Sequence, residues 1–202
     1  MQTVLAIDTA APRLQLALFV DDRVDVSIDD LAQGHAELLF ARLAALLHRN
    51  NLTYGDLTRI AVTTGPGSFT GLRIGLAAAR GLGLALDIPV LGVPSLQALS
   101  LHAKPGHPTA VLVDARRGEA YFQRFFGPGE PWDAPLLLPL EEARRLVQFG
   151  VTPIETPFCD IAALARYASD LNPELFPPEA SYVRSADAKP QDKARVARVG
   201  AL

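Results

Sequence analysis

The sequence predicts an α/β fold, and two observations support this class. The chain opens with three short apolar segments separated by tight turns, which is the pattern of an antiparallel meander. Beyond the meander, strand-like and helical stretches alternate up to residue 103. A crossover helix between two strands of one sheet makes those strands parallel. We therefore expect a mixed sheet, antiparallel at its start and parallel beyond, with helices packed against it.

The first of these elements is a central strand. Val4–Ile7 is a continuous apolar run, as in strands buried on both faces, whereas 24–28 alternates apolar and polar residues like a strand at a sheet edge. In order, the expected elements are strands 4–7, 14–20 and 24–28, helix 34–47, strand 60–63, helix 70–86, strand 88–94 and a helix capped by Ser95. This is the order of one lobe of the ribonuclease H-like, actin-like ATPase fold.

A second, smaller lobe is expected after a break. Lys104-Pro105-Gly106-His107-Pro108 interrupts the chain, so we place a first lobe at 1–103 and a second at 104–182. Within the second lobe we expect a hairpin of 110–115 and 119–126, a helix over 140–149 and a last helix over 158–171, which is a candidate to pack back on the first lobe. Residues 183–202 carry five basic and two acidic side chains, and we expect them to form a flexible basic tail.

The helix expected at 70–86 is unusual because it is rich in glycine. Each glycine costs about 1 kcal/mol relative to alanine in a helix interior. Gly71, Gly75, Ala79 and Gly83 recur every four residues and share one stripe, which lets another backbone approach closely. Helix 34–47 likewise has more apolar surface than one contact needs. We expect the glycine stripe to meet a partner protein, so that Gly75→Leu would leave the chain folded and block association.

Composition narrows the possible functions. The chain is 49% hydrophobic and 20% charged, and its net charge of −3 provides no basic field for strong nucleic-acid binding. Cys159 is the single cysteine, which fits a reducing compartment. We see no basic leader and no run of about 20 apolar residues, so we expect a cytoplasmic protein that does not enter the membrane.

A nucleotide site is the main catalytic alternative. The turn from Gly65 to Thr70 joins a strand to a helix, where backbone N–H groups could cradle a phosphate. Leu72 and Arg73 stand where a Walker loop would need Lys and Ser or Thr, so we favour a structural turn. Asp8 follows the first strand. Its carboxylate could lie near a metal ion and phosphates, or it could bond to the backbone of its own turn, and we favour the turn role. Asp8, Gly67 and Ser68 remain weak candidates for nucleotide contacts.

The sequence shows no motif of a metal site or of a serine hydrolase. The four histidines, His35, His48, His102 and His107, are scattered and match no metal-ligand spacing, and no Gly-x-Ser-x-Gly elbow occurs. A glycopeptidase-like hydrolase would need a metal ligand set that this sequence lacks. We expect no metal, no cofactor and no catalytic residue.

The segment Gly65-Pro66-Gly67-Ser68-Phe69-Thr70-Gly71-Leu72-Arg73-Ile74-Gly75 resembles the signature of the bacterial TsaB (YeaZ-type) family. Further similarities are Leu5-Ala6-Ile7-Asp8-Thr9, Gly34-His35, Asp114-Ala115-Arg116 and Tyr182-Val183-Arg184. The resemblance implies two actin-like lobes without an active site. It further implies a scaffold subunit that binds TsaD, the transferase that makes threonylcarbamoyladenosine in tRNA, and that helps to recruit the ATPase TsaE.

The same resemblance implies an interface on helices 34–47 and 70–86, a homodimer when the chain is alone, and indirect contact with tRNA. The interface residues it implies are His35, Leu38, Arg42, Gly71, Leu72, Arg73, Gly75, Leu76, Ala79 and Arg80. Between 149 and 158 this chain has room for only eight residues where relatives carry a further strand and a glycine loop, so we expect a truncated second lobe. An ATP-hydrolysing enzyme using Asp8 and the Gly65–Thr70 turn remains the alternative function.

Overall fold

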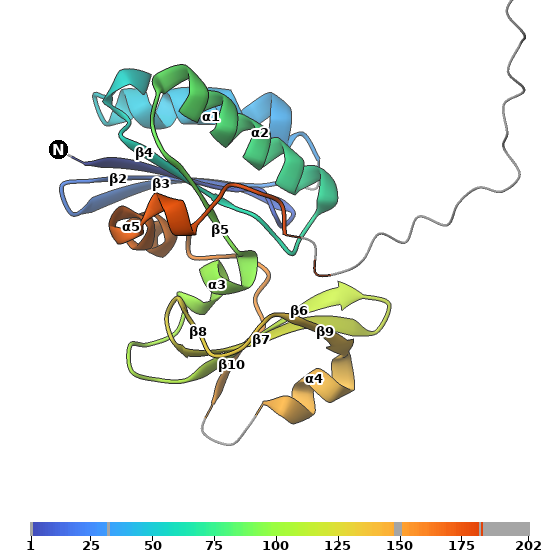
Figure 1. Ribbon diagram of the computed structural model, residues 1–202. Coiled ribbons are helices and arrows are strands. Elements are labelled where there is room, and N and C mark those ends of the chain that lie inside the picture. Colours follow the sequence, from blue (N-terminus) through green and yellow to red (C-terminus); the bar gives the residue numbers. More distant parts are fainter. Residues whose placement is uncertain (1, 32, 148–150, 182, 184–202) are drawn as a thin grey trace, which may run out of the picture.

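The computed structural model describes residues 2–31, 33–147, 151–181 and 183. The expected basic tail lies outside this range, apart from Val183. Within it the chain forms two sheets with helices above, between and below them (Figure 1).

The first sheet has five strands in the order β3-β2-β1-β4-β5. β1, β2 and β3 pair antiparallel, whereas β4 pairs parallel with β1 and β5 parallel with β4. This confirms the predicted meander and the ribonuclease H-like, actin-like class. The bounds are β1 Thr3–Asp8, β2 Arg13–Val20, β3 Arg23–Asp30, β4 Arg59–Thr63 and β5 Val90–Val93.

Two long helices, α1 (His35–Arg49) and α2 (Phe69–Leu86), lie side by side on one face of this sheet (Figure 1). They bury the side chains that β1 directs to that face, such as Leu5 and Ile7. Val4 and Ala6 point to the opposite face and pack against α5 (Ile161–Asp170). β1 is therefore apolar throughout because both of its faces are covered.

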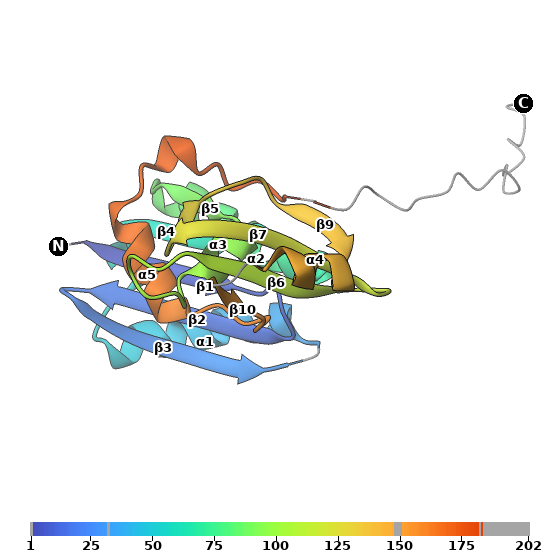
Figure 2. The same ribbon diagram turned by 90° about the horizontal axis from the view of Figure 1, so that it is seen from below.

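The second sheet is built on the predicted hairpin of β6 (Thr109–Arg116) and β7 (Glu119–Gly127). Three short strands that the sequence did not predict complete it: β8 (Glu130–Pro131), β9 (Leu136–Pro139) and β10 (Thr152–Ile154). β10 lies between 149 and 158, where we expected no strand. α4 (Leu140–Leu146) covers the outer face of the sheet, which is seen from that side in Figure 2.

The two sheets share a core. α3 (Ser95–Ser100) and α5 lie between them, and Leu96 and Leu164 belong to one buried cluster with Val111 and Phe125 of the second sheet. Tyr54–Asp56 and Pro173–Leu175 each form a 3-10 turn. The predicted cap at Ser95 was wrong: Pro94 is the cap residue, and the Ser95 hydroxyl instead accepts from the Gly65 N–H at 3.0 Å. The lobe boundaries stay predictions.

α2 is the one helix in the described ranges that is long and apolar enough, by length and composition, to cross a membrane. Core helices of water-soluble proteins meet the same criterion. Here its packing on β4 and β1 gives the apolar composition a role within the fold.

Candidate functional site

Hydrogen bonds of Ser68 and the backbone conformation of Gly65 define the turn before α2. Ser68 caps the helix by accepting from the Gly71 N–H at 3.2 Å. The Ser68 N–H donates to the Ala10 carbonyl at 2.7 Å, which ties the turn to the loop after β1. Gly65 has φ +108°, in the left-handed region that favours glycine.

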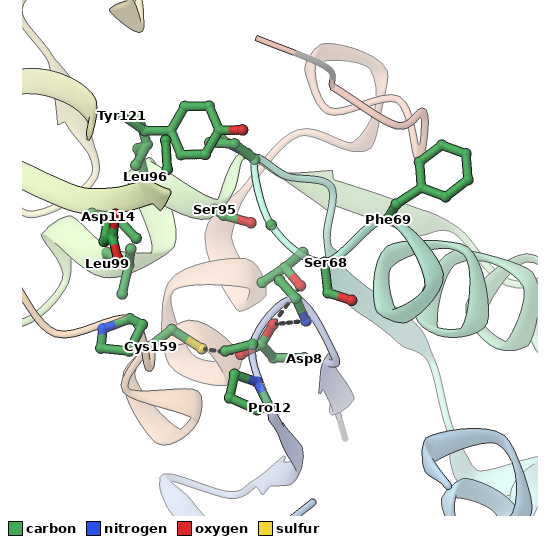
Figure 3. Close-up of a pocket in the computed structure, with 18 of the residues that line it drawn as sticks. Asp8, Pro12, Ser68, Phe69, Ser95, Leu96, Leu99, Asp114, Tyr121 and Cys159 are labelled. Atoms are coloured by element: carbon green, nitrogen blue, oxygen red, sulfur yellow. Dashed lines mark hydrogen bonds between the residues drawn. The ribbon is translucent and has the colours of Figure 1, made fainter. Parts of the chain in front are cut away.

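A cavity of about 430 Å³ opens beside this turn, between the two sheets (Figure 3). Asp8, Ser68 and Ser95 line it from the first sheet's side, and Asp114 and Tyr121 from the hairpin of the second sheet. The cavity sits at the carboxyl ends of β1 and β4, where ligands bind in open α/β sheets. The structure thus brings Asp8, Gly67 and Ser68, the weak nucleotide candidates, into one place.

Asp8 itself is 2% exposed, and its carboxylate is fully engaged. Oδ1 accepts from the Ala10 N–H at 3.0 Å and the Thr63 hydroxyl at 2.6 Å. Oδ2 accepts from Gln15 Nε2 at 3.0 Å and the Cys159 thiol at 3.3 Å. The bond to Ala10 is that of a turn aspartate, and the other donors join β1, β2, β4 and the segment before α5. This network gives Asp8 a structural role.

The Cys159 thiol is held in its neutral form. Burial, and then the negative charge of Asp8, raise the pKa of this thiol well above its usual value. A protonated thiol donates a hydrogen bond and is a poor nucleophile. Cys159 therefore anchors Asp8 rather than offering reactive sulfur to the cavity.

The charges around the cavity disfavour a free phosphate. Asp8 and Asp114 contribute carboxylates, and Arg116 is the one basic side chain among the described residues that line it. A Cβ on Gly67 would lie 2.6 Å from the Ala10 carbonyl oxygen, so close packing alone explains this glycine. The described residues contain no group of three or more His, Cys, Asp or Glu side chains placed to hold a metal ion.

The glycine stripe of α2 faces its own sheet, which corrects the sequence-based expectation. A Cβ on Gly71 would lie 1.9 Å from the Thr9 carbonyl oxygen, and one on Gly75 2.4 Å from Thr9 Oγ1. A Cβ on Gly83 would lie 2.2 Å from Val90 Cγ2. The close neighbours of the stripe are therefore Thr9, in the loop after β1, and the Val90 side chain of β5, rather than a partner. Gly75→Leu should consequently disrupt folding, contrary to the earlier expectation.

Several of the expected interface residues are also inside the chain. Leu72, Leu76, Ala79 and His35 are buried, as are Gly71 and Gly75. Burial in the chain's own core rules them out as a free docking surface. Leu38 is half-buried, whereas Arg42, Arg73 and Arg80 are exposed. Of the ten expected residues, the three arginines are thus the exposed ones.

The outer face of α1 and α2 forms an apolar groove of about 750 Å³. Phe40 is 47% exposed, Phe69 55%, and Leu84, further along α2, 87%. The groove is lined by Ala36, Leu39, Phe40, Phe69, Thr70, Arg73, Ile74, Ala77, Ala78, Gly81 and Leu82. We name this surface, with Leu84 and Arg80, the α1/α2 face. Of the expected interface residues on α2, Arg73 and Arg80 belong to this face, whereas the others lie on the buried side of the helix.

Three kinds of comparison bear on this chain. The family model described as "TsaD: tRNA N6-adenosine threonylcarbamoyltransferase" matches residues 29–134, 106 of the 202 residues. The Escherichia coli protein named "tRNA threonylcarbamoyladenosine biosynthesis protein TsaB" is 34% identical over 125 residues, covering 60% of this chain and 54% of that protein. An uncharacterized protein of Mycobacterium leprae is 35% identical over 208 residues, which covers 94% of this chain and 57% of that protein.

Among solved structures, YeaZ from Pseudomonas aeruginosa superposes with a TM-score of 0.73 at 25% identity, covering 90% of this chain and all of that one. The chain spans a little more than half the length of these two curated relatives. The similarity thus extends across both sheets in the solved structure, while the curated relatives contain further sequence.

Proposed function

The chain belongs to the TsaB (YeaZ-type) family, and on that premise we propose that it is a non-catalytic scaffold subunit in the biosynthesis of threonylcarbamoyladenosine in tRNA. In this role it binds the catalytic TsaD subunit through the α1/α2 face. The proposal also includes recruitment of the ATPase TsaE, indirect contact with tRNA, a homodimer in the absence of TsaD, and a cytoplasmic location.

The observation that carries the proposal is the apolar character of the α1/α2 face. A surface helix normally has a polar outer side, whereas the outward residues of α2 include Phe69, Ala77 and Leu84. Exposed contiguous apolar surface of this kind marks protein-protein interaction sites. α1 adds Phe40, so the two helices together provide one two-helix platform.

The interior supports the absence of an active site in this subunit. Asp8, the best-placed carboxylate in the cavity between the sheets, has each oxygen occupied by two donors of the chain itself. Cys159 is a neutral donor. Neither group is available as a general base or nucleophile without breaking that network.

A nucleotide-binding enzyme is the second candidate, and the cavity at the end of β1 and β4 is the observation in its favour. ATP hydrolysis by the purified chain that is lost in Asp8→Ala, in a variant shown to be folded, would support it. We expect no such activity.

The scaffold role is tested by size-exclusion chromatography with light scattering, using the chain alone and with TsaD from the same source at micromolar concentration. We expect a mixed complex that replaces any homodimer. Phe40→Asp, which places a charge in the groove, should weaken the complex by about 30-fold or more, the scale of an interface hot spot.

Leu175→Asp is the matched control, since Leu175 is 73% exposed in the turn Pro173–Leu175, away from the α1/α2 face. It should bind TsaD like the unmodified chain. The proposal would be contradicted if the chain did not bind TsaD, or if Phe40→Asp and Leu175→Asp weakened the complex equally.

A further inference from the structure

The hairpin of β6 and β7 carries two opposite charges at the cavity between the sheets. Asp114 and Arg116 both line this cavity, and both are exposed. The Arg116 N–H donates to Asp114 Oδ1 at 2.7 Å, so the two residues are held next to each other. Within the described part of the chain, neither side chain has an ion-pair partner. Each charge is therefore available to a ligand in the cavity.

The backbone at these two residues departs from a regular strand. The register of β6 and β7 shifts between Asp114 and Arg116, so Ala115 is the extra residue of a β-bulge. Arg116 has φ +63°, in the left-handed region that is unfavourable for a residue with a Cβ. Arg117 and Gly118 already close the hairpin as a two-residue turn with positive φ at both positions. The strain at Arg116 is thus additional to the turn, and strained positions of this kind cluster at ligand-binding sites.

The wall of the cavity next to this charged pair is aliphatic. Leu96 and Leu99 of α3 line it together with Val113 of β6 and Pro157 (Figure 3). The volume of about 430 Å³ is at the lower end of the roughly 300–1,000 Å³ found for small-molecule sites. The cavity therefore suits a small ligand that combines two opposite charges at one end with an aliphatic body.

We propose that this cavity binds an aliphatic L-α-amino acid, whose ammonium group pairs with Asp114 and whose carboxylate pairs with Arg116. Both charged groups of an amino acid are bonded to its α-carbon, so two adjacent side chains of opposite sign can reach them together. The planar guanidinium of arginine binds a carboxylate through two parallel hydrogen bonds. The aliphatic side chain of the ligand lies against Leu96, Leu99 and Val113, where it is removed from water. This site goes beyond the scaffold role and does not depend on it.

Charge distinguishes this ligand from other small molecules of similar size. A nucleotide would bring several negative charges close to the carboxylates of Asp8 and Asp114, which repel them. A simple amine would leave Arg116 without an anion, and a simple carboxylic acid would leave Asp114 without a cation. A zwitterion pairs with both side chains and adds no net charge to the cavity.

Isothermal titration calorimetry on the purified full chain tests the class of ligand. L-leucine is the probe, and two matched analogues each lack one of its charges: L-leucinamide has no carboxylate, and N-acetyl-L-leucine has no ammonium group. We expect L-leucine to bind at a single site. Each analogue should bind at least about 10-fold more weakly, because it loses a charge-assisted hydrogen bond.

Two variants assign each charge to its side chain. Asp114→Asn keeps the oxygen that accepts from the Arg116 N–H, so the hairpin should stay folded. It should weaken L-leucine binding about 10-fold or more and leave N-acetyl-L-leucine binding unchanged, since that analogue has no ammonium group. Arg116→Gln should likewise weaken L-leucine and leave L-leucinamide unchanged. A merely structural role of either residue would instead weaken the probe and both analogues alike.

Asp170→Asn and Arg145→Gln are the matched controls, because they make the same charge changes at exposed positions of α5 and α4 outside the cavity. Both should bind L-leucine like the unmodified chain. The inference is overturned if L-leucine does not bind, if the analogues bind as tightly as L-leucine, or if Asp114→Asn and Arg116→Gln bind it like the controls. Binding of ATP in place of L-leucine would equally overturn it. Each of these results would leave the scaffold role standing, since that role rests on the α1/α2 face.

Discussion

Replacing Gly71 by alanine tests how α2 is seated on its own lobe. The added Cβ would lie 1.9 Å from the Thr9 carbonyl oxygen, and an ordinary contact begins at 3.4 Å, so the helix and the loop must separate by about 1.5 Å. Two hydrogen bonds of 2.7 Å hold them together, from Thr9 Oγ1 to the Gly71 carbonyl and from the Ser68 N–H to the Ala10 carbonyl.

The magnitude follows from three terms. Overpacking costs about 1–3 kcal/mol. Each weakened hydrogen bond adds about 0.5–1.5 kcal/mol, while alanine returns about 1 kcal/mol of helix propensity. We expect a net loss of about 1–5 kcal/mol in the free energy of unfolding. For a chain of this size that lowers the melting temperature by roughly 2–20 °C.

The assay is urea unfolding followed by circular dichroism, with Gly81→Ala as the matched control. Gly81 sits in the same helix with nothing near its Cβ, so alanine should stabilise the chain there by about 1 kcal/mol. Opposite signs for the two substitutions are the expected result. A neutral or stabilising Gly71→Ala would refute the close packing of α2 on the loop after β1.

Two further substitutions probe the interior. Because the pKa of Cys159 is raised in the folded chain, the unfolded chain loses this proton first, so the free energy of unfolding should fall as the pH rises above about 9. Urea titrations from neutral to alkaline pH should show this decline in the unmodified chain and a smaller one in Cys159→Ala; equal declines would contradict it. Arg59 donates through Nη1 to three carbonyls at the end of α5, those of Ala168, Ser169 and Leu171, at 2.7–2.9 Å. Arg59→Met should therefore cost about 1–3 kcal/mol in the same unfolding assay, and an unchanged midpoint would show that α5 does not depend on this contact.

The elements of the first sheet could be predicted because their patterns are local. The continuous apolar run Val4–Ile7 predicts a strand that is covered on both faces. The alternation of apolar and polar residues over 24–28 predicts an edge strand. The short strands β8, β9 and β10 could not be predicted, since their two to four residues show no period and form only against β6 and β7. Ser95 looked like a helix cap, but its hydroxyl accepts from Gly65, thirty residues away.

For the candidate site too, the features set by local sequence could be predicted and those set by distant contacts could not. Periodicity identified α1 and α2 as helices with excess apolar surface, and the glycine spacing correctly indicated a close backbone approach. It could not say which backbone, because Thr9 lies about sixty residues from Gly71 in the sequence and meets it only in the fold. The exposed side of α2 is the complement of the buried stripe. Knowing that one stripe faces the sheet would have predicted the outward positions of Phe69, Arg73, Ala77, Arg80 and Leu84.

We propose that the outer side of α1 and α2 is the surface that holds the catalytic partner. Hydrogen exchange measured by mass spectrometry, on the chain alone and saturated with TsaD from the same source, tests it most directly. We predict slower exchange over 35–49 and 69–86 in the complex, with exchange over 136–146 unchanged. Protection confined to the second sheet and α4, or no protection anywhere, would contradict the account.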